Sequence, residues 1–166
     1  MRIHCLALAA ALLLGACAEN ATGPDVGSGT ELETTVNGQE LVLNLNTDAS
    51  TTYYDDALNQ GYFSGTLVGS PSRTILLRFT YDIDNGAIPT TLGGDAVNIV
   101  YTEIPASGPA LNYDCPITGG NCRITLSASN GEIVDGTFSA TLTERNDATK
   151  QVTITNGKFS VRLPRR

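Results

Sequence analysis

Two cysteines in the second half of the chain, Cys115 and Cys122, are separated by six residues in the stretch NYDCPITGGNCRI. Cysteines at short spacing are typical of metal sites, redox centres and disulfides. A zinc site needs four ligands, commonly Cys or His, whereas redox motifs usually show the closer C-x-x-C spacing. The choice among the three depends on the other cysteines and histidines and on the compartment in which the chain folds.

The first sixteen residues have the pattern of a secretory signal peptide. Arg2 supplies a positive charge, and residues 5–14 form an apolar run that is shorter than the roughly 20 residues needed to cross a bilayer. The following LGAC, residues 14–17, resembles the lipobox of bacterial lipoproteins, in which the peptide is cut before the cysteine, whose thiol and new amine are then acylated. We therefore expect a lipoprotein signal peptide over residues 1–16 and lipidation of Cys17. An ordinary cleavage site in the same stretch is the alternative.

The residues after Cys17 predict where such a lipoprotein resides. In lipoproteins of diderm bacteria, an Asp directly after the cysteine tends to retain the protein at the inner membrane, and here Ala18 and Glu19 follow instead. The resemblance implies the outer membrane, with the lipid bilayer as a partner through acylated Cys17. The acyl chains of such an anchor are more numerous than the two membrane-binding signals that stable attachment to a bilayer usually needs. Residues 17–31 are small, polar and rich in Gly, which predicts a flexible tether behind the lipidated cysteine.

The histidine and charge inventory disfavours several classes of function. His4 is the only histidine and leaves with the signal peptide, so the mature chain has no imidazole for catalytic triads, general bases or metal ligation. Removing residues 1–16 takes one of ten basic side chains and none of seventeen acidic ones, which makes the formal charge −8. An acidic protein gains little from phosphate-rich polymers, so nucleic acid is not expected as a partner. We predict no cofactor and no metal site.

The same inventory decides the chemistry of the cysteine pair. With Cys5 removed and Cys17 lipidated, only Cys115 and Cys122 remain, which is too few for zinc. An exported compartment is oxidising, and the intervening PITGGN reads as a turn. We predict a disulfide that pins a hairpin tip next to a strand at residues 123–128.

From residue 32 onward the apolar pattern has a period of two, which predicts an all-β domain over residues 32–166. Asn37-Gly38 lies between two strand-like runs and suits a two-residue hairpin turn. Further strands are expected at residues 61–68, 73–83, 96–104 and 123–128. Strands of this length between Gly, Pro and Asn turns predict one antiparallel β-sandwich or barrel of about eight to ten strands.

The last quarter of the chain shows the clearest strand pattern. Residues 134–143 alternate apolar and polar side chains, which is typical of a half-buried antiparallel strand. In the segment that follows, the apolar residues occupy even-numbered positions before Asn156-Gly157 and odd-numbered positions after it. A two-residue hairpin turn explains this change by pairing Ile154 with Phe159, and a bulge in one long strand is the alternative.

Residues 131–163 resemble an uncharacterised family of small bacterial lipoproteins that carry a β-rich domain of unknown function. The lipobox and the TVNGQELV hairpin agree with that resemblance. The residues that carry it are Gly131, Gly136, Phe138, Ile154, Thr155, Gly157 and Phe159. The resemblance implies a fold and a location, and it implies no activity.

The stretch NTDASTTYYDDALNQG, residues 46–61, is long for a connection in a compact domain, and such loops are often functional. Tyr53 and Tyr54 offer flat amphipathic surface, and Asp55 and Asp56 offer hydrogen-bond acceptors. We single out these four as candidate ligand-binding residues for a sugar or a cation. A solvated loop with one helical turn is the alternative. Catalysis is disfavoured, because neighbouring carboxylates in a polar loop lack the facing geometry that glycosidases require.

Two further charged motifs have structural explanations. The string DIDNG, residues 82–86, begins like an EF-hand loop, but its twelfth position would be Gly93 instead of Glu, so we predict a turn, with a looser oxygen-ligand site as the alternative. The string RLPRR, residues 162–166, holds three arginines. We expect a solvated tail there, and contact with anionic headgroups is the alternative.

These patterns together predict an outer-membrane-anchored lipoprotein whose β domain acts as a binding or structural module of the cell envelope. An envelope protein or glycan would be its partner, and no enzymatic activity is expected. A lipocalin-like carrier of a small apolar ligand and a histidine-independent envelope hydrolase are the alternatives.

Overall fold

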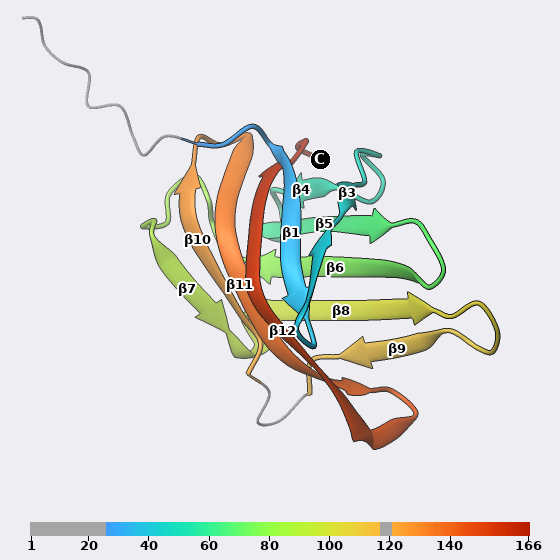
Figure 1. Ribbon diagram of the computed structural model, residues 1–166. Helices are drawn as coiled ribbons and strands as arrows, with labels where there is room; N and C mark the ends of the chain where they lie inside the picture. The colour runs from blue at the N-terminus through green and yellow to red at the C-terminus, as the bar shows by residue number, and fades with distance from the viewer. Residues whose placement is uncertain (1–25, 117–120) are drawn as a thin grey trace, which may run out of the picture.

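The computed structural model describes residues 26–116 and 121–166. Within them, twelve strands form one antiparallel sheet that folds into two layers, so the domain is all-β as predicted (Figure 1). No helix in the described part of the chain is long and apolar enough to cross a membrane. The predicted signal peptide, Cys17 and most of the predicted tether lie outside the described residues.

The strands of the two layers cross at a steep angle in Figure 1. The first layer holds β1 (Thr30–Val36), β2 (Gln39–Val42), β7 (Thr90–Gly93), β10 (Arg123–Ser129), β11 (Ile133–Glu144) and β12 (Asp147–Arg162). The second holds β3 (Asn44–Leu45), β4 (Tyr53–Asp55), β5 (Gln60–Leu67), β6 (Ser72–Thr80), β8 (Val97–Ile104) and β9 (Leu111–Asp114), and the short 3-10 helix η1 (Gly94–Ala96) precedes β8. The count exceeds the expected eight to ten because β2, β3, β4, β7 and β9 have four residues or fewer. Such short segments leave little periodic pattern in a sequence.

The two ends of the sheet meet although the sheet is not closed. The hydrogen-bonded path runs β2-β1-β12-β11-β9-β8-β6-β5-β3. Its end strands, β2 and β3, are separated in the chain only by Leu43, whose N–H donates to the carbonyl of Leu32 at 2.9 Å. The continuous segment of residues 39–45 therefore pairs with β1 at its start and with β5 at its end. The domain is sandwich-like, and the barrel alternative is set aside.

Strand β11 pairs with strands of both layers. On the side away from β12, residues 134–139 pair with β10, whereas the last two residues pair with β9. The sheet forks there, and the disulfide Cys115–Cys122 joins the end of β9 to the start of β10 with 6.1 Å between the Cα atoms. The predicted disulfide is confirmed. The predicted hairpin tip is wrong, because β9 and β10 both pair with β11 and not with each other.

Apolar side chains between the layers form the core. Phe63 of β5 and Phe159 of β12 come from opposite layers, and their ring centroids are 4.9 Å apart. The alternating face predicted for β11 is confirmed, because its members are all buried: Val134, Gly136, Phe138, Ala140 and Leu142. Burial of this face removes apolar surface from water and holds the two layers together.

Strand β12 is one long strand, so the predicted hairpin at Asn156-Gly157 is wrong and the bulge alternative is right. Thr155 and Asn156 of β12 together oppose a single residue of β11, Ser139. Asn156 has a φ of 52°, which lies in the left-handed region that Asn tolerates better than most residues. The extra residue flips the side-chain parity, so Ile154 and Phe159 both face the core. The hairpin at Asn37-Gly38, in contrast, is confirmed between β1 and β2.

Two reciprocal glycine–phenylalanine pairs join β11 to β12. Gly136 opposes Phe159, and Phe138 opposes Gly157. A Cβ atom on Gly136 would lie 2.5 Å from the Phe159 ring, and one on Gly157 would lie 2.6 Å from the Phe138 ring. Each ring therefore occupies the space above a glycine backbone on the neighbouring strand. Any larger residue at the glycine position would fill this space and clash with the ring.

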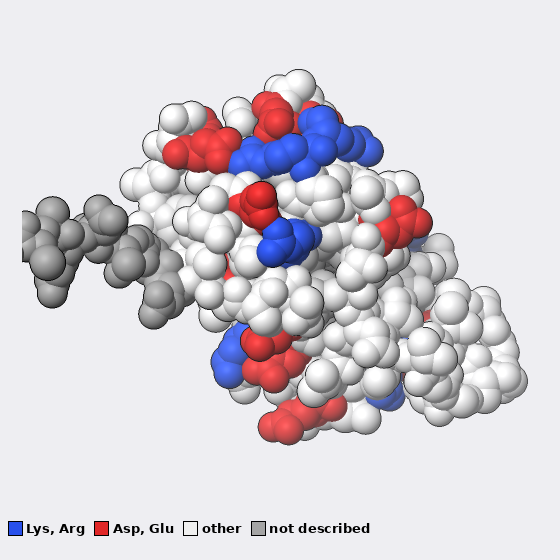
Figure 2. Space-filling view, turned by 90° about the horizontal axis from the view of Figure 1, so that it is seen from above, with Lys and Arg blue, Asp and Glu red and all other residues white. Residues whose placement is uncertain are grey.

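Opposite charges lie side by side at the end of the molecule that carries β4 and the last residues of the chain. Figure 2 looks onto this end and shows Lys and Arg side chains directly beside Asp and Glu. The ion pairs here are Arg165–Asp56, Arg165–Asp84, Arg166–Asp55 and Arg162–Glu132. The charges on the surface in this view, which is otherwise largely uncharged, therefore compensate one another.

Candidate functional site

The predicted loop at residues 46–61 ends in a short β-hairpin. Tyr53 opposes Tyr62 and Asp55 opposes Gln60 in the β4–β5 ladder. The rings of Tyr53 and Tyr62 stack with their centroids 5.4 Å apart and their planes 12° from parallel. Hairpin formation thus places the two candidate tyrosines on successive positions of one strand, which point to opposite faces.

The segment Pro164–Arg166 lies along β4. The N–H of Tyr54 donates to the carbonyl of Pro164 at 2.8 Å, and the N–H of Arg166 donates to the carbonyl of Tyr54 at 3.0 Å. Tyr54 and Arg165 form a parallel bridge. The segment RLPRR is exposed to solvent at four of its five residues, as predicted, but it is not a loose tail, because its backbone pairs with the free edge of β4.

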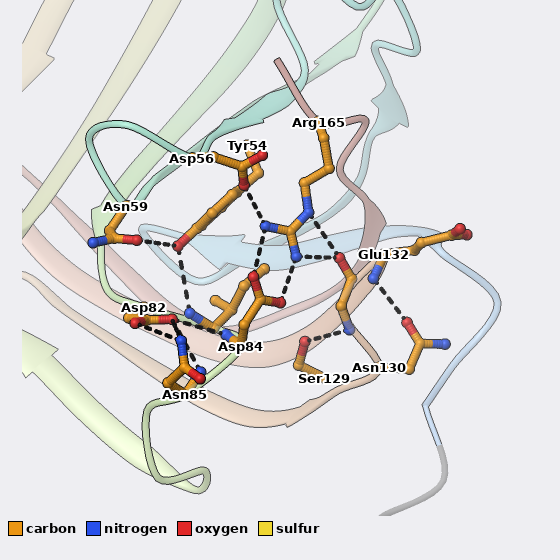
Figure 3. Close-up of polar contacts among 12 residues, drawn as sticks. Tyr54, Asp56, Asn59, Asp82, Asp84, Asn85, Ser129, Asn130, Glu132 and Arg165 are labelled. Atoms are coloured by element: carbon orange, nitrogen blue, oxygen red, sulfur yellow. Dashed lines mark hydrogen bonds and ion pairs between the residues drawn. The ribbon is translucent and has the colours of Figure 1, made fainter.

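Arg165 stands at the centre of the polar contacts at this end of the domain (Figure 3). Its two Nη groups donate to both carboxylate oxygens of Asp84 at 3.0 and 2.6 Å, and Nη1 also donates to Asp56 Oδ1 at 2.5 Å. Nε and Nη2 donate to the carbonyl of Gly131 at 3.1 and 2.7 Å. The guanidinium carbon lies 4.5 Å from the ring centroid of Tyr54. One side chain therefore joins the β4–β5 turn, the β6–β7 connection and the β10–β11 turn.

The electrostatics of this cluster favour the charged guanidinium. The hydrogen bonds to Asp84 raise the pKa of Arg165 above its ordinary value, and those to Asp56 add to the effect, although burial opposes it. Burial raises the pKa of the Tyr54 phenol, whose hydroxyl donates to the carbonyl of Tyr81 at 2.7 Å. Charge-assisted bidentate pairs of this kind have specific geometry as well as strength.

The string at residues 82–86 is the predicted turn. The Asp82 carboxylate accepts hydrogen bonds from the N–H groups of Asp84 and Asn85 at 3.1 and 3.0 Å (Figure 3). These bonds, chiefly the one from the Asn85 backbone, lower the pKa of Asp82. The side chain closes its own turn in the way that Asp commonly does, and Asp84 is committed to Arg165.

The structure brings the four candidate residues together, but against the protein's own arginines. Tyr54 is 1% exposed. The Arg166 guanidinium carbon lies 3.6 Å from the ring centroid of Tyr53, and Arg166 Nε lies 3.7 Å from Asp55 Oδ2. Ligand binding by these residues stays a prediction, and it would require the arginines to give up these contacts.

A groove of about 740 Å³ crosses the outer face of the first layer, over β10, β11, β12, β1 and β2. Its volume falls within the roughly 300–1,000 Å³ that is usual for ligand sites. Successive ladder partners form one row across it: Thr125, Thr137, Lys158, Glu33 and Val42. Sequence reasoning missed this groove because each strand contributes one or a few polar residues of ordinary type.

Hydroxyl and amide groups form most of the polar lining of the groove, beside apolar surface from Leu41, Val42 and Phe138, and its charges compensate one another. Arg123 and Lys158 are balanced by Glu33 and Glu40. Lys158 Nζ lies 3.1 Å from Glu33 Oε1. The threonines, Ser139 and the Asn156 side chain supply both donors and acceptors. Such a surface suits a ligand that is polar and carries no net charge.

Residues 26–116 and 121–166 contain no group of three or more His, Cys, Asp or Glu side chains placed to hold a metal ion. Comparisons with protein-family models, with curated proteins and with solved structures gave no match. The resemblance of residues 131–163 to small bacterial lipoproteins therefore stays a prediction.

Proposed function

We propose that the chain is a lipoprotein of the bacterial outer membrane whose β domain binds an uncharged, hydroxyl-rich polymer, a glycan of the cell envelope. The observation that carries the proposal is the groove across β10, β11, β12, β1 and β2. A tethered domain with such a groove is a binding module of the envelope.

The location is supported by the signal-peptide pattern, by the lipobox that ends at Cys17 and by the disulfide Cys115–Cys122. Disulfides persist in oxidising compartments such as the bacterial periplasm. Strand β1 begins at Thr30, so the folded domain starts soon after Cys17 and would remain close to the bilayer that holds the lipid anchor.

The ligand class follows from the composition of the groove. Sugar hydroxyls both donate and accept hydrogen bonds, as do the threonine and serine hydroxyls that line it. The compensated charges of Lys158 and Glu33 give no advantage to a polyanion. Val42 is 73% exposed at the rim and offers apolar surface to the face of a sugar ring.

The two alternatives receive less support. A carrier of an apolar ligand needs space between its layers that side chains do not fill, and here Phe63 and Phe159 meet across that space. A hydrolase needs two carboxylates facing a scissile bond, and Asp55 and Asp56 are paired with arginines. We propose no catalytic activity.

Fractionation of cells tests the anchor. The variant Cys17→Ala should move from the membrane fraction to the soluble fraction, because only a thiol at that position can receive the diacylglycerol. Cys5→Ala, in the predicted signal peptide, is the matched control and should stay with the membranes. A Cys17→Ala protein that still pellets with membranes would show that the lipoprotein part of the proposal is wrong.

Binding to an insoluble, uncharged glycan tests the groove. The full chain in detergent should co-sediment with chitin, an uncharged polymer of N-acetylglucosamine, and Thr137→Glu should weaken binding about tenfold, which corresponds to about 1.4 kcal/mol. Thr153→Glu places the same charge on an exposed position of β12 outside the groove and should bind as the unaltered chain does. Equal binding by both variants, or no binding by the unaltered chain, would contradict the glycan part of the proposal.

A further inference from the structure

A second, smaller pocket of about 220 Å³ opens where the tip of the β1–β2 hairpin approaches β6, β8 and β9. It shares no residue with the outer groove. Its apolar lining includes Val36 and Val152, which are 7% and 5% exposed. Its polar lining includes Arg73, Glu103 and Tyr113. The pocket therefore has a mainly polar lining with a small apolar surface, and its volume is below the roughly 300–1,000 Å³ of drug-sized ligand sites, so it suits only a very small polar molecule.

Arg73 presents unused hydrogen-bond donors to this pocket. Its side chain is 16% exposed, and its Nε donates to Glu103 Oε2 at 3.1 Å. Neither Nη group makes a hydrogen bond to a residue that the structure describes. A guanidinium carries five N–H donors, and the pair of Nη groups has the spacing that a carboxylate accepts in a bidentate way.

Glu103 presents the complementary group. Its Oε2 accepts from Arg73 and also from the Tyr101 hydroxyl at 2.8 Å. Its Oε1 has no hydrogen-bond partner within residues 26–116 and 121–166. Burial, together with Glu103, raises the pKa of Tyr101 far above its ordinary value, so the phenol stays a donor and holds the carboxylate in place. A carboxylate oxygen thus remains available as an acceptor beside the guanidinium.

Tyr113 supplies a third unsatisfied group. The residue is 8% exposed, and its ring packs against Tyr101 with 5.9 Å between ring centroids. Its hydroxyl makes no hydrogen bond to any described residue and is open to solvent, because only Asp135 and Glu144 carry fully buried side-chain oxygens without a partner in the described part of the chain. The neighbouring charges Glu144 and Lys150 pair with each other at 3.2 Å. The Tyr113 hydroxyl is therefore left for a molecule in the pocket.

We propose that this pocket binds a small zwitterion with a carboxylate and an ammonium group on neighbouring atoms, such as a free α-amino acid. The carboxylate pairs with the two Nη groups of Arg73 and accepts from Tyr113, and the ammonium donates to Glu103 Oε1. Arg73 and Glu103 already pair with each other, so an anion alone would leave the free Glu103 Oε1 without a donor, and a cation alone would leave the free Nη groups of Arg73 without an acceptor. The proposal concerns residues outside the groove and does not depend on glycan binding.

Calorimetric titration of the full chain in detergent tests the pocket with L-alanine and L-leucine as probes. Both amino acids should bind saturably at one site. N-acetylation removes the ammonium charge and methyl esterification removes the carboxylate, so each derivative should bind at least about tenfold more weakly. Glucose serves as an uncharged polar probe of similar size and should not bind here. Equal binding of the derivatives, preferred binding of glucose, or no binding of either amino acid would overturn the proposal.

Two conservative variants locate the site. Tyr113→Phe removes only the unpartnered hydroxyl and should weaken amino-acid binding about fivefold to tenfold. Glu103→Gln keeps an acceptor for Tyr101, removes the charge and should abolish the preference for the free amine over the N-acetyl derivative. Thr137→Glu, in the groove, should bind amino acids normally. Circular dichroism of each variant verifies the fold, and unchanged affinity in both pocket variants would place the binding elsewhere and refute the assignment.

Discussion

Arg165 and Asp84 lie 81 positions apart in the chain and meet through two charge-assisted hydrogen bonds of 2.6 and 3.0 Å. The same guanidinium also bonds Asp56 and the carbonyl of Gly131. These contacts hold the β4–β5 turn, the β6–β7 connection and the β10–β11 turn against the C-terminal segment. They also use Asp56, one of the candidate ligand-binding residues predicted from the sequence.

Replacing Arg165 should destabilise the domain through the loss of this cluster. Arg165→Gln should lower the free energy of unfolding by about 1 kcal/mol, since the side chain is 30% exposed and solvent screens part of each ion pair. Chemical denaturation measures the change. Arg166→Gln is the matched control and should cost less than about 0.5 kcal/mol, because Arg166 is 51% exposed and its Nε is 3.7 Å from Asp55. Equal effects of the two variants would contradict a central role for Arg165.

Gly136 should tolerate no side chain. A Cβ there would lie 2.3 Å from the carbonyl oxygen of Thr125 and 2.5 Å from the Phe159 ring. Gly136→Ala should therefore lower the free energy of unfolding by about 2–3 kcal/mol through overpacking. At Gly69 an added Cβ would have only the Pro71 carbonyl oxygen nearby, at 3.6 Å, so Gly69→Ala should change stability by less than about 0.5 kcal/mol. Similar losses at both positions would argue against the glycine–phenylalanine pairing.

The disulfide should stabilise the fork between β9 and β10. Removing it by the double replacement of Cys115 and Cys122 with Ser should lower the free energy of unfolding by about 2.5 kcal/mol, the chain-entropy value for a loop of about eight residues. Denaturation with and without reductant should give the same difference for the unaltered chain and none for the variant. An intact mass that does not rise by two hydrogens on reduction would show that the bond is absent.

Alkaline pH should destabilise the domain through its buried tyrosines. Burial, with the hydrogen bond to Glu103, raises the pKa of Tyr101 above the ordinary value of 10.0, so the folded state keeps a proton that the unfolded state loses. The associated stability is complete below pH 10 and falls as the pH rises further. Denaturation at several alkaline pH values should show this decline, and Tyr101→Phe should make it shallower. A stability that is constant above pH 10 in the unaltered chain would contradict the expected linkage.

The local pattern of the chain was enough to predict several elements. Alternation along β11 identified its buried face, and Asn37-Gly38 identified a hairpin turn, because both depend on neighbours a few positions away. The cysteine count predicted the disulfide by elimination. In contrast, the change in the spacing of apolar residues at Asn156 was compatible with a hairpin turn or with a bulge in one strand. The local pattern favoured the hairpin. The bulge prevails because β12 pairs on both sides, with β1 and β11, along a continuous length.

Contacts between distant segments decided the candidate sites. Residues 53–56 are polar and aromatic in the sequence, yet Arg165 and Arg166 fold back onto them. The groove row and the Arg73–Glu103 pocket assemble from several strands whose register no single segment contains. A side-chain period of two depends only on the backbone of one strand, whereas strand partners and ion pairs depend on which long-range arrangement buries the most apolar surface at the least cost in polar groups. For that reason the all-β class was readable from the amino-acid order, and the surfaces available for binding became visible only in the folded chain.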